Sequence, residues 1–552
     1  RAYALERLAE TGDANATRRR HMQWCVSFAV QATALVHGPG RWELQERLDA
    51  ESANLQAALE WALDHGFESD AAELARALAW HWLDRDRFQP CIEQLRAALA
   101  GRSSPETETE SRALLGTALF LSGEEQAAYE EYLRTAELAK RLDPSPLKVW
   151  SLTACARIHL LGVDRDPRPA LPLCRQALTD AEACGDPFAL IYARRALGRA
   201  LAWNGDADGG VEQHAAALGV ALATGDPAVT LQTYESFLDL LYLHPTARRS
   251  EPKRLVDEML ARFPPSGEPW GYRVLQGDWL VWAFCQSGDW DRADATLRDV
   301  ARLHLEGWSS VGQLVSRSVL RWMQGRLEDA HADLAELQEL GVPPGWYHDY
   351  YPLLAEIAAD EGRLDDVRGI AAAYLAVDAV PAEEAKKVAV LAPLARAEVD
   401  AALAADDGLR DDHVRRAASA VERAREILAI FPPLTGGSLQ METPATQLAL
   451  AEAELSRVAG PDPTLWEDAV ARADYVYFRL YARWRLAESL LEAGRSAESK
   501  AELRRAHGEA AAIGAKRLRE RLETTARRCG VELAVPAISR RRKATPDAMT
   551  GE

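Results

Sequence analysis

Apolar side chains recur along this chain at the spacing of an α-helix, and short polar turns interrupt them. On both sides of the turn Asn204-Gly205-Asp206 the apolar positions lie three or four residues apart: Leu197, Leu201, Val211, Ala215 and Leu218. A period near 3.6 residues places such side chains on one face of a helix. The pattern therefore predicts two amphipathic helices joined by a tight turn.

Each such pair of helices is bounded by a repeated stop signal. ACGDP occupies 183–187 and ATGDP occupies 223–227, which lie 40 residues apart. Glycine ends a helix in a left-handed conformation, aspartate caps the next helix, and proline fits the first helical turn. The repeating unit is therefore helix, tight turn, helix, stop.

The same turn signal recurs along most of the chain. The turn glycines Gly288, Gly325 and Gly362 follow one another at intervals of 37 residues, close to the tetratricopeptide period of roughly 34. We expect about eleven or twelve hairpins and an all-α, superhelical solenoid of tetratricopeptide-like (TPR-like) antiparallel helical hairpins. The further turns on which this prediction depends are LSGE at 121–124, QSGD at 286–289, MQGR at 323–326, DEGR at 360–363 and EAGR at 492–495.

A small residue follows several of these glycines, at a place where two helices have to approach closely. We expect this role for Ala127, Ala293, Ala330 and Ala497. Two proline- and glycine-containing inserts, FPPSG at 263–267 and FPPLTGG at 431–437, interrupt the repeats. Inserts of this composition favour bends or offsets in the stack, and the second is a candidate hinge.

These signals divide the chain into five predicted parts. The repeats form three blocks separated by the two inserts, and the two ends differ from them in composition. The proposed boundaries are 1–30 for the end of a preceding winged-helix or linker helix, 31–262 for the first TPR-like block, 263–430 for the second, 431–533 for the C-terminal repeats, and 534–552 for a flexible basic tail.

Charge limits the partners of the chain. A formal net charge of -19 repels phosphate backbones and anionic lipid surfaces. We therefore expect no direct contact with nucleic acid and none with a membrane. The basic run RRRK at 540–543 is the local exception, either as a solvated linker or as an auxiliary phosphate contact.

The sequence carries no motif for catalysis or for a cofactor. It contains no phosphate-binding loop, no nucleophile elbow and no metalloprotease motif. The seven cysteines are scattered without a C-x-x-C pair, which favours buried free thiols in a reducing cytoplasm. The histidines, among them His81, His159 and His331, lack a second ligand one turn away. We expect a protein that is not an enzyme and that holds no cofactor and no metal.

Aromatic residues concentrate between Trp270 and Tyr351. One interpretation is that they fill the seams between hairpins. The other is a groove with aromatic walls that grips a peptide or a small molecule, because aromatic side chains anchor binding sites out of proportion to their number. On the second interpretation Asp349 is a further polar contact, and the candidate groove residues are Trp308, Trp346, Tyr347, His348 and Tyr350.

The two ends of the chain resemble a known family. DAESANLQAALEWA at 49–62 is similar to the junction between the winged helix and the helical repeats of bacterial signal-transduction (STAND, AfsR-like) ATPases. YARWRLAESLLEAG at 481–494, followed by AH at 506–507 and IGA at 513–515, resembles the last repeats of large LuxR-type regulators. Two positions depart from the family pattern: RDR at 85–87 replaces a usual glycine, and Val476-Tyr477 replaces a usual Pro-Tyr pair.

This resemblance implies a cytoplasmic, regulatory repeat region of a bacterial transcriptional regulator. Such a region binds a protein or small-molecule signal in the groove of its solenoid and controls an adjacent NTPase and an adjacent helix-turn-helix domain. The start of the sequence, RAYALE, resembles neither an initiating Met nor a signal peptide, and we expect a longer parent chain. Two alternatives stay open, namely a freestanding interaction scaffold and the repeat tail of an ATPase-linked nucleotide cyclase.

Overall fold

The computed structural model describes most of the chain in helices. The described residues are 14–33, 41–83, 87–160, 166–243, 250–263, 277–301, 307–341, 347–377, 384–431, 442–460 and 462–533. Within this part there are 25 α-helices and one short 3-10 helix, and no strand. None of these helices is long and apolar enough to cross a membrane.

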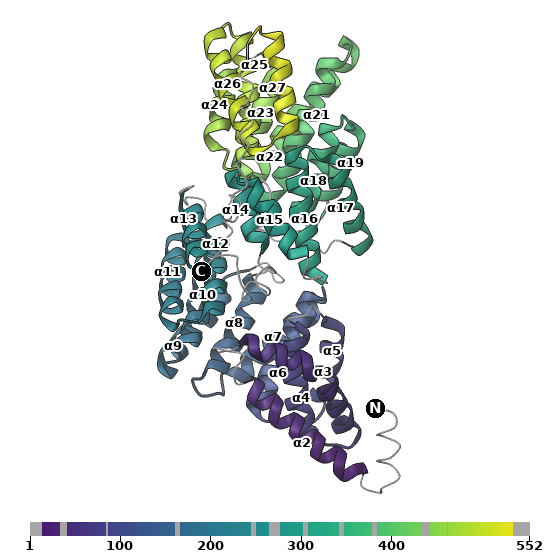
Figure 1. The fold of residues 1–552 in the computed structure, drawn as a ribbon, viewed down its shortest axis with the longest axis vertical. Coiled ribbons are helices and arrows are strands. Elements are labelled where there is room, and N and C mark those ends of the chain that lie inside the picture. Colours follow the sequence, from purple (N-terminus) through teal and green to yellow (C-terminus); the bar gives the residue numbers. More distant parts are fainter. Residues whose placement is uncertain are drawn as a thin grey trace, which may run out of the picture.

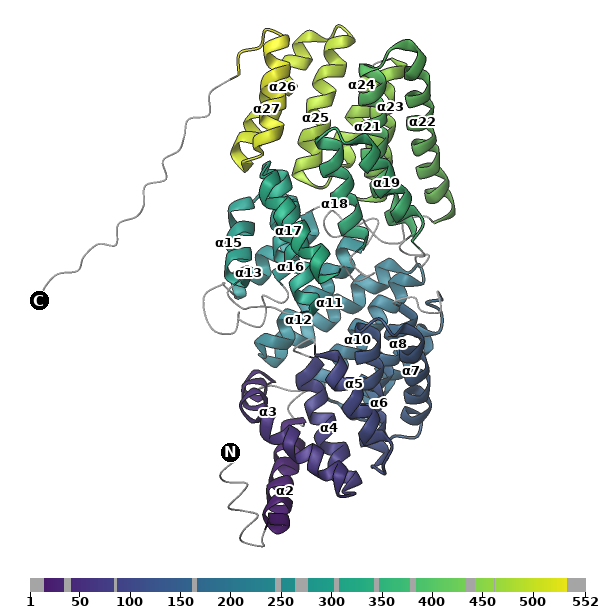
Figure 2. The ribbon, with the colours of Figure 1, turned by 90° about the vertical axis from the view of Figure 1, so that its right-hand side faces the viewer.

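Consecutive helices pair as antiparallel hairpins that stack into an elongated solenoid (Figures 1 and 2). The first pairs along the chain are α4 (Glu68–Leu83) with α5 (Phe88–Leu99), α6 (Pro105–Leu121) with α7 (Glu125–Ala139), α8 (Pro146–Leu160) with α9 (Ala170–Cys184), α10 (Pro187–Trp203) with α11 (Ala207–Thr224), and α12 (Pro227–Leu243) with α13 (Ser250–Arg262). From α4 to α12 the first helix of each pair also contacts the first helix of the next pair, so these helices form one layer of the stack.

The stack continues in the same way to the C-terminal end of the described chain. The remaining pairs are α14 (Gly277–Ser287) with α15 (Trp290–Ala301), α16 (Gly307–Gln324) with α17 (Leu327–Leu340), α18 (Tyr347–Asp360) with α19 (Leu364–Leu375), α21 (Leu391–Ala404) with α22 (Asp407–Ile430), α23 (Pro444–Ala459) with α24 (Pro463–Arg472), and α25 (Val476–Glu492) with α26 (Ser496–Ile513). Helices α2 (Ala14–Thr33) and α3 (Arg41–Asp64) pack on α4, the 3-10 helix η3 (Ala385–Val390) leads into α21, and α27 (Lys516–Arg528) follows α26.

The predicted stop signals are confirmed in atomic detail. Gly185 and Gly225 end α9 and α11 with φ of 68° and 69°, in the left-handed region that glycine tolerates best. Asp186 then accepts a hydrogen bond from the backbone N–H of Ala189 at 2.8 Å, and Pro187 occupies the first turn of α10. The helix boundaries therefore follow from local residue chemistry.

The small residue at the crossing of the two helices lies five positions after the turn glycine. Ala293 and Ala330 occupy this position and are 0% exposed, as expected. Two of the expected positions are wrong, because the buried residue is Ala128 instead of Ala127 and Ser499 instead of Ala497. In each case the buried residue donates its N–H to the carbonyl of the residue that follows the turn glycine, which fixes its distance from the turn.

The apolar core has two large parts. One cluster of buried side chains extends from Met22 to Ile158, and a second extends from Leu218 to Val531. Three smaller clusters lie between them, and alanine makes up most of the first and half of the second. The second cluster runs across both inserts that separate the predicted blocks, and the block boundaries stay a prediction.

A glycine pair permits the close contact of α10 with α11. A Cβ atom added to Gly198 would lie 2.8 Å from the carbonyl oxygen of Gly210 and even closer to Nδ1 of His214. His214 cannot move away easily, because it is fully buried and its Nε2 lies 3.0 Å from Oγ of Ser236. The two helices are therefore closer than alanine at position 198 would allow.

We expect Gly198→Ala to lower the free energy of unfolding by about 1–3 kcal/mol, the usual range for overpacking a filled site. Urea unfolding followed by circular dichroism measures the change. Gly219→Ala on α11 is the control, since its new Cβ would meet nothing within 4 Å, and it should be neutral or stabilise by up to about 1 kcal/mol. Equal stability of the two variants would contradict the close packing at Gly198.

Candidate functional site

Four of the five predicted groove residues belong to the first turns of α16 and α18. Trp346 is outside the described residues, and Trp308, Tyr347 and His348 belong to these helices without described side chains. Tyr350 is 8% exposed, and its hydroxyl lies 3.3 Å from Nε2 of Gln338, which donates to it. The structure thus places Tyr350 in the core, while the groove prediction for the other four residues stays a prediction.

The described tryptophans of the same region fill seams and have internal hydrogen-bond partners. The indole N–H of Trp282 donates to Oγ of Ser316 at 3.0 Å, and that of Trp290 donates to the carbonyl of Cys285 at 3.2 Å. The indole N–H of Trp322 donates to Oδ2 of Asp360 at 3.0 Å. These three side chains are at most 2% exposed, so they contribute to packing and not to an open wall.

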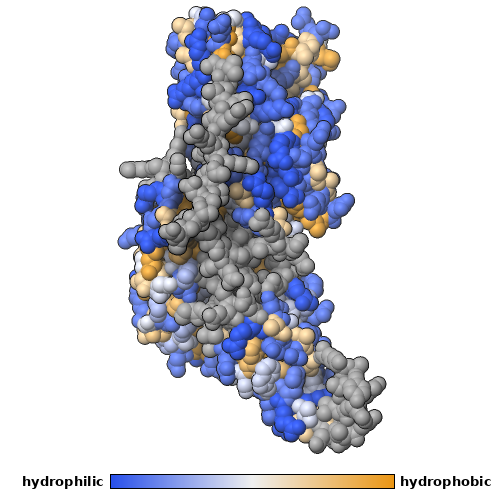
Figure 3. All heavy atoms as spheres, in the orientation of Figure 1, coloured by the Kyte–Doolittle hydropathy of each residue, from blue (hydrophilic) through white to orange (hydrophobic). Residues whose placement is uncertain are grey.

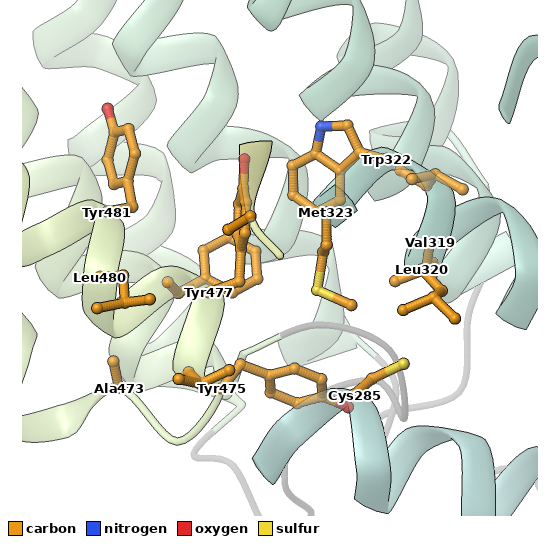
Figure 4. Packing of buried hydrophobic residues seen from close by; sticks show 14 of the residues in the cluster. Cys285, Val319, Leu320, Trp322, Met323, Ala473, Tyr475, Tyr477, Leu480 and Tyr481 are labelled. Carbon is orange, nitrogen blue, oxygen red and sulfur yellow. The ribbon is translucent and has the colours of Figure 1, made fainter. Parts of the chain in front are cut away.

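The last helices of the chain return to the middle of the solenoid. Helix α25 contacts α14, and α27 contacts α16. Figure 4 shows Trp322 and Met323 of α16 facing Tyr477 of α25 across this junction, and the ring centroids of Trp322 and Tyr477 are 4.8 Å apart. A Cβ atom at Gly325 would lie 3.2 Å from Arg517 of α27. The C-terminal half therefore closes on itself.

Asp360, the last residue of α18, lies at the centre of this closure. Its carboxylate accepts hydrogen bonds from Trp322 at 3.0 Å and from Arg521 of α27 at 2.8 Å. Arg396 of α21 approaches it to 3.5 Å, and Arg517 of α27 donates to its backbone carbonyl. One buried aspartate thus joins α16, α18, α21 and α27, and we call these contacts the Asp360 junction.

The charges around Asp360 are strongly coupled. Burial alone would raise the pKa of Asp360, but Arg396, Arg521 and Arg517 together hold the pKa below its usual value. One turn earlier, burial raises the pKa of Glu356, although Arg396 lies 2.8 Å away. Asp360 is therefore the firmly ionised carboxylate of the pair, and its charge balances the arginines of α27.

A second charged centre surrounds Glu454 of α23. Arg457 binds its carboxylate at 2.6 Å, the hydroxyl of Tyr481 donates to it, and Arg485 lies 3.7 Å away. Burial opposes ionisation, yet Arg457 and Arg485 lower the pKa of Glu454 to about 2. Arg485 also lies 4.1 Å above the ring of Trp484. Cation, anion and aromatic rings therefore form one connected network through α23 and α25.

A small polar cavity of about 230 Å³ opens beside this second centre. Arg457, Arg485 and Glu488 line it together with Trp466. Ser489 also lines it, and the buried hydroxyl of Ser489 has no hydrogen-bond partner among the described residues. The lining can therefore hold a small polar molecule or a few waters.

A larger groove, of about 830 Å³, runs between α17, α18 and α19. Leu334, Leu354, Ile357 and Ile370 form its apolar floor, and Gln338 lies along it. Its rim carries an ion network in which Glu361 contacts His331 at 2.7 Å and Arg363 at 2.7 Å. We call it the α17–α19 groove. Its floor is aliphatic, and Tyr350, the predicted groove residue whose side chain is described, does not line it.

The fold is a TPR-like solenoid. No protein-family model matches the sequence, and no curated protein matches it. Among solved structures the chain is similar to a Rap protein complexed with Competence and Sporulation Factor, with a TM-score of 0.41 and 13% identity over 64% of this chain and 97% of that chain. It is also similar to yeast Tom70, with a TM-score of 0.32 and 11% identity over 85% and 96% of the two chains.

A third similar structure is the Cut9–Hcn1 hetero-tetramer of the APC/C. The TM-score is 0.35 and the identity 10%, over 87% of this chain and 95% of that chain. At such values the three structures do not bear on the function of this solenoid. Function has to be argued from its own residues.

Sequence inspection missed the two charged centres. Asp360 was seen only as part of a turn, and Arg517 and Arg521 lie 157 and 161 residues away from it. The available signal was the run KRLRERL at 516–522, a strongly basic stretch in an acidic chain with Leu518 and Leu522 at helical spacing. A helix that places arginines beside buried leucines indicates a partner carboxylate, although the sequence does not say which one.

Proposed function

We propose that this chain is the regulatory repeat region of a bacterial transcriptional regulator. In this role it binds a protein or small-molecule signal and controls an adjacent NTPase and an adjacent helix-turn-helix domain. The resemblance at both ends of the sequence supports the context of the parent chain, and the Asp360 junction supports the mechanism.

The observation that carries the proposal is the two-sided environment of α18. Leu354 and Ile357 of α18, and Glu361 directly after the helix, line the α17–α19 groove. Glu356 and Asp360 lie on another face and bind Arg396 and the arginines of α27. A ligand in the groove therefore touches the same helix that holds α27 in place.

A signal can act through this helix only if it binds one arrangement of the repeats more tightly than another. The contacts that hold α27 are polar and converge on one carboxylate, so a small displacement of α18 breaks several of them together. In the family that the C-terminal end resembles, the DNA-binding domain follows the last repeat. Release of α27 would thus transmit groove binding to that domain.

One of the predicted groove residues, Tyr350, has a described contact with the lining of this groove. Gln338 lines the groove and donates a hydrogen bond to Tyr350, and Trp346, Tyr347 and His348 lie two to four positions before Tyr350 in sequence. We propose that these three residues, with Trp308, extend the groove at that end. Protein and small-molecule signals remain alternatives for its occupant.

The test starts with the open reading frame on either side of the segment. A phosphate-binding loop upstream and a helix-turn-helix downstream are expected. In that parent protein Asp360→Asn should make ATP hydrolysis and DNA binding independent of the signal. Asp412→Asn removes an exposed carboxylate of α22 that pairs with Arg415, outside the groove and the Asp360 junction, and should leave both regulated. An open reading frame without these domains would leave the interaction scaffold as the better reading, and one with a cyclase domain would favour the cyclase tail.

A further inference from the structure

The residues that line the α17–α19 groove recur at helical spacing. On α17 the lining residues Leu334, Ala335 and Gln338 lie three, four and seven positions after His331. Side chains at this spacing follow one face of a helix over two turns, which is about 10 Å. Helices α17 and α19 are the second helices of successive pairs, and α18 supplies the floor between them. The groove is therefore a channel about two helical turns long.

Both walls of this channel carry a small residue. Ala335 of α17 and Gly369 of α19 are exposed. A Cβ atom added to Gly369 would meet nothing within 4 Å, so no part of the described chain fills the space in front of it. Below the walls, Leu354 and Ile370 are half-buried and Ile357 is buried. A ligand backbone can therefore approach both walls closely while its apolar side chains reach the floor.

The rim of the groove is acidic. Among the lining residues that the structure describes, the carboxylates of Glu361, Asp365 and Asp366 outnumber the single guanidinium of Arg363. The side chain of Asp365 is 93% exposed and that of Asp366 is 53% exposed. Helix α17 adds five acidic residues and no Lys or Arg. Figure 3 shows a mostly hydrophilic surface around α16 to α19, with small hydrophobic patches between. The groove therefore attracts a cationic partner and repels an anionic one.

We propose that the α17–α19 groove binds a short amphipathic helix from a protein partner. Aliphatic side chains of this helix contact Leu354 and Ile370 on the floor, and its Lys or Arg side chains contact Asp365 and Asp366 on the rim. The inference rests on the proposed function because it takes this groove as the signal site. It narrows the signal to a basic, helical segment.

A helix suits this groove better than an extended peptide. A helix pairs its own backbone N–H and C=O groups, whereas an extended peptide would carry unpaired backbone groups into the groove. The part of the chain that the structure describes contains no strand, so the groove has no strand edge there to pair with them. Apolar anchors at positions i, i+3, i+4 and i+7 of a bound helix repeat the two-turn spacing of the lining on α17.

Binding can be measured with a synthetic peptide of about 14 residues, a length at which isolated helices become marginally stable. Its leucines follow one helical face and its other positions are mainly lysine. Fluorescence anisotropy of the end-labelled peptide with the whole chain should give a Kd below about 1 mM, and binding should weaken as salt is added. A peptide of the same composition with its leucines spread around the helix, and a peptide with glutamate in place of lysine, should each bind at least about tenfold more weakly.

Gly369→Leu is the variant that closes the groove. Its new side chain would occupy the space between the walls, and leucine favours a helix more than glycine does, so the fold should persist. Peptide binding should weaken at least about tenfold. The matched control is Gly219→Leu on α11, another exposed helical glycine with nothing within 4 Å of the new Cβ, far along the chain from the groove. It should bind like wild type.

The acidic rim is tested by combining Asp365→Asn with Asp366→Asn. Both side chains are exposed, and exposed charge pairs contribute little each, so binding should weaken about two- to fivefold. The dependence of binding on salt should become flatter than in wild type, because fewer charges then attract the peptide. An unchanged salt dependence would contradict the role given to the rim.

Three further results would overturn the proposal. One is the absence of binding of the leucine–lysine peptide up to about 1 mM, and another is equal binding of either control peptide. The third is equal binding by Gly369→Leu and wild type, which would place the peptide elsewhere on the acidic surface. All these measurements use this chain alone, whereas the regulatory proposal is tested on the open reading frame and on Asp360→Asn in the parent protein. Failure of one therefore does not imply failure of the other.

Discussion

Replacing Asp360 by asparagine is expected to lower the free energy of unfolding of the C-terminal half by about 3–5 kcal/mol, the cost of leaving buried charge without its partner. Asparagine has nearly the same shape and can still accept the hydrogen bond from Trp322. It cannot balance the positive charges of Arg521 at 2.8 Å and Arg396 at 3.5 Å. The side chain of Asp360 is 1% exposed, so water cannot replace the lost charge.

The control for this variant is Asp366→Asn on α19. Asp366 is paired with Arg363, but its side chain is 53% exposed, and exposed ion pairs contribute at most about 1 kcal/mol. Urea unfolding gives the two stabilities, and hydrogen exchange of backbone amides locates the change. In Asp360→Asn, exchange should increase in α16, α18 and α27 and stay unchanged in α4 to α10. A uniform increase, or equal stability of both variants, would show that Asp360 does not hold α27.

Local signals allowed the sequence to predict the repeat architecture. The stops at Gly185 and Gly225 combine a left-handed glycine, a capping aspartate and a proline in five residues, and each acts over less than one helical turn. Such features are visible without tertiary structure. The prediction of the small residue at the helix crossing was wrong at Ala127 and Ala497. The buried position depends on how the second helix leaves the turn, and not on which nearby residue is an alanine.

The closure of the C-terminal half could not be predicted in the same way. Contacts between Asp360 and Arg521 join residues 161 positions apart, and no local pattern specifies which carboxylate a distant arginine will meet. The aromatic cluster shows the same limit. The sequence shows that aromatic residues are frequent in this region. Whether an indole such as that of Trp322 faces a groove or a buried carboxylate depends on where helices from distant parts of the chain pack.

The second large expected effect is a dependence of stability on pH that arises from Glu454. Its pKa is lowered from 4.5 to about 2 in the folded protein, which corresponds to about 3 kcal/mol. A carboxylate with a lowered folded pKa stabilises the protein fully above its unfolded pKa. That stabilisation is lost as the pH falls from about 4.5 toward 2, because the folded state must then take up a proton that the unfolded state binds more readily.

Glu454→Gln should therefore lose about 3 kcal/mol at pH 7 and show a flatter decline in stability between pH 4.5 and 2 than wild type. The matched control is Glu452→Gln on the same helix, where the carboxylate is 27% exposed and pairs with Arg425 at 2.7 Å. It removes the same charge outside the buried network of Arg457, Tyr481 and Arg485, so it should retain the acid-dependent decline of the wild type. Urea unfolding at a series of pH values measures all three proteins. A parallel decline in wild type and Glu454→Gln would mean that Glu454 is not the ionised centre of α23 and α25, since only a group that titrates differently in the folded and unfolded states can change the slope.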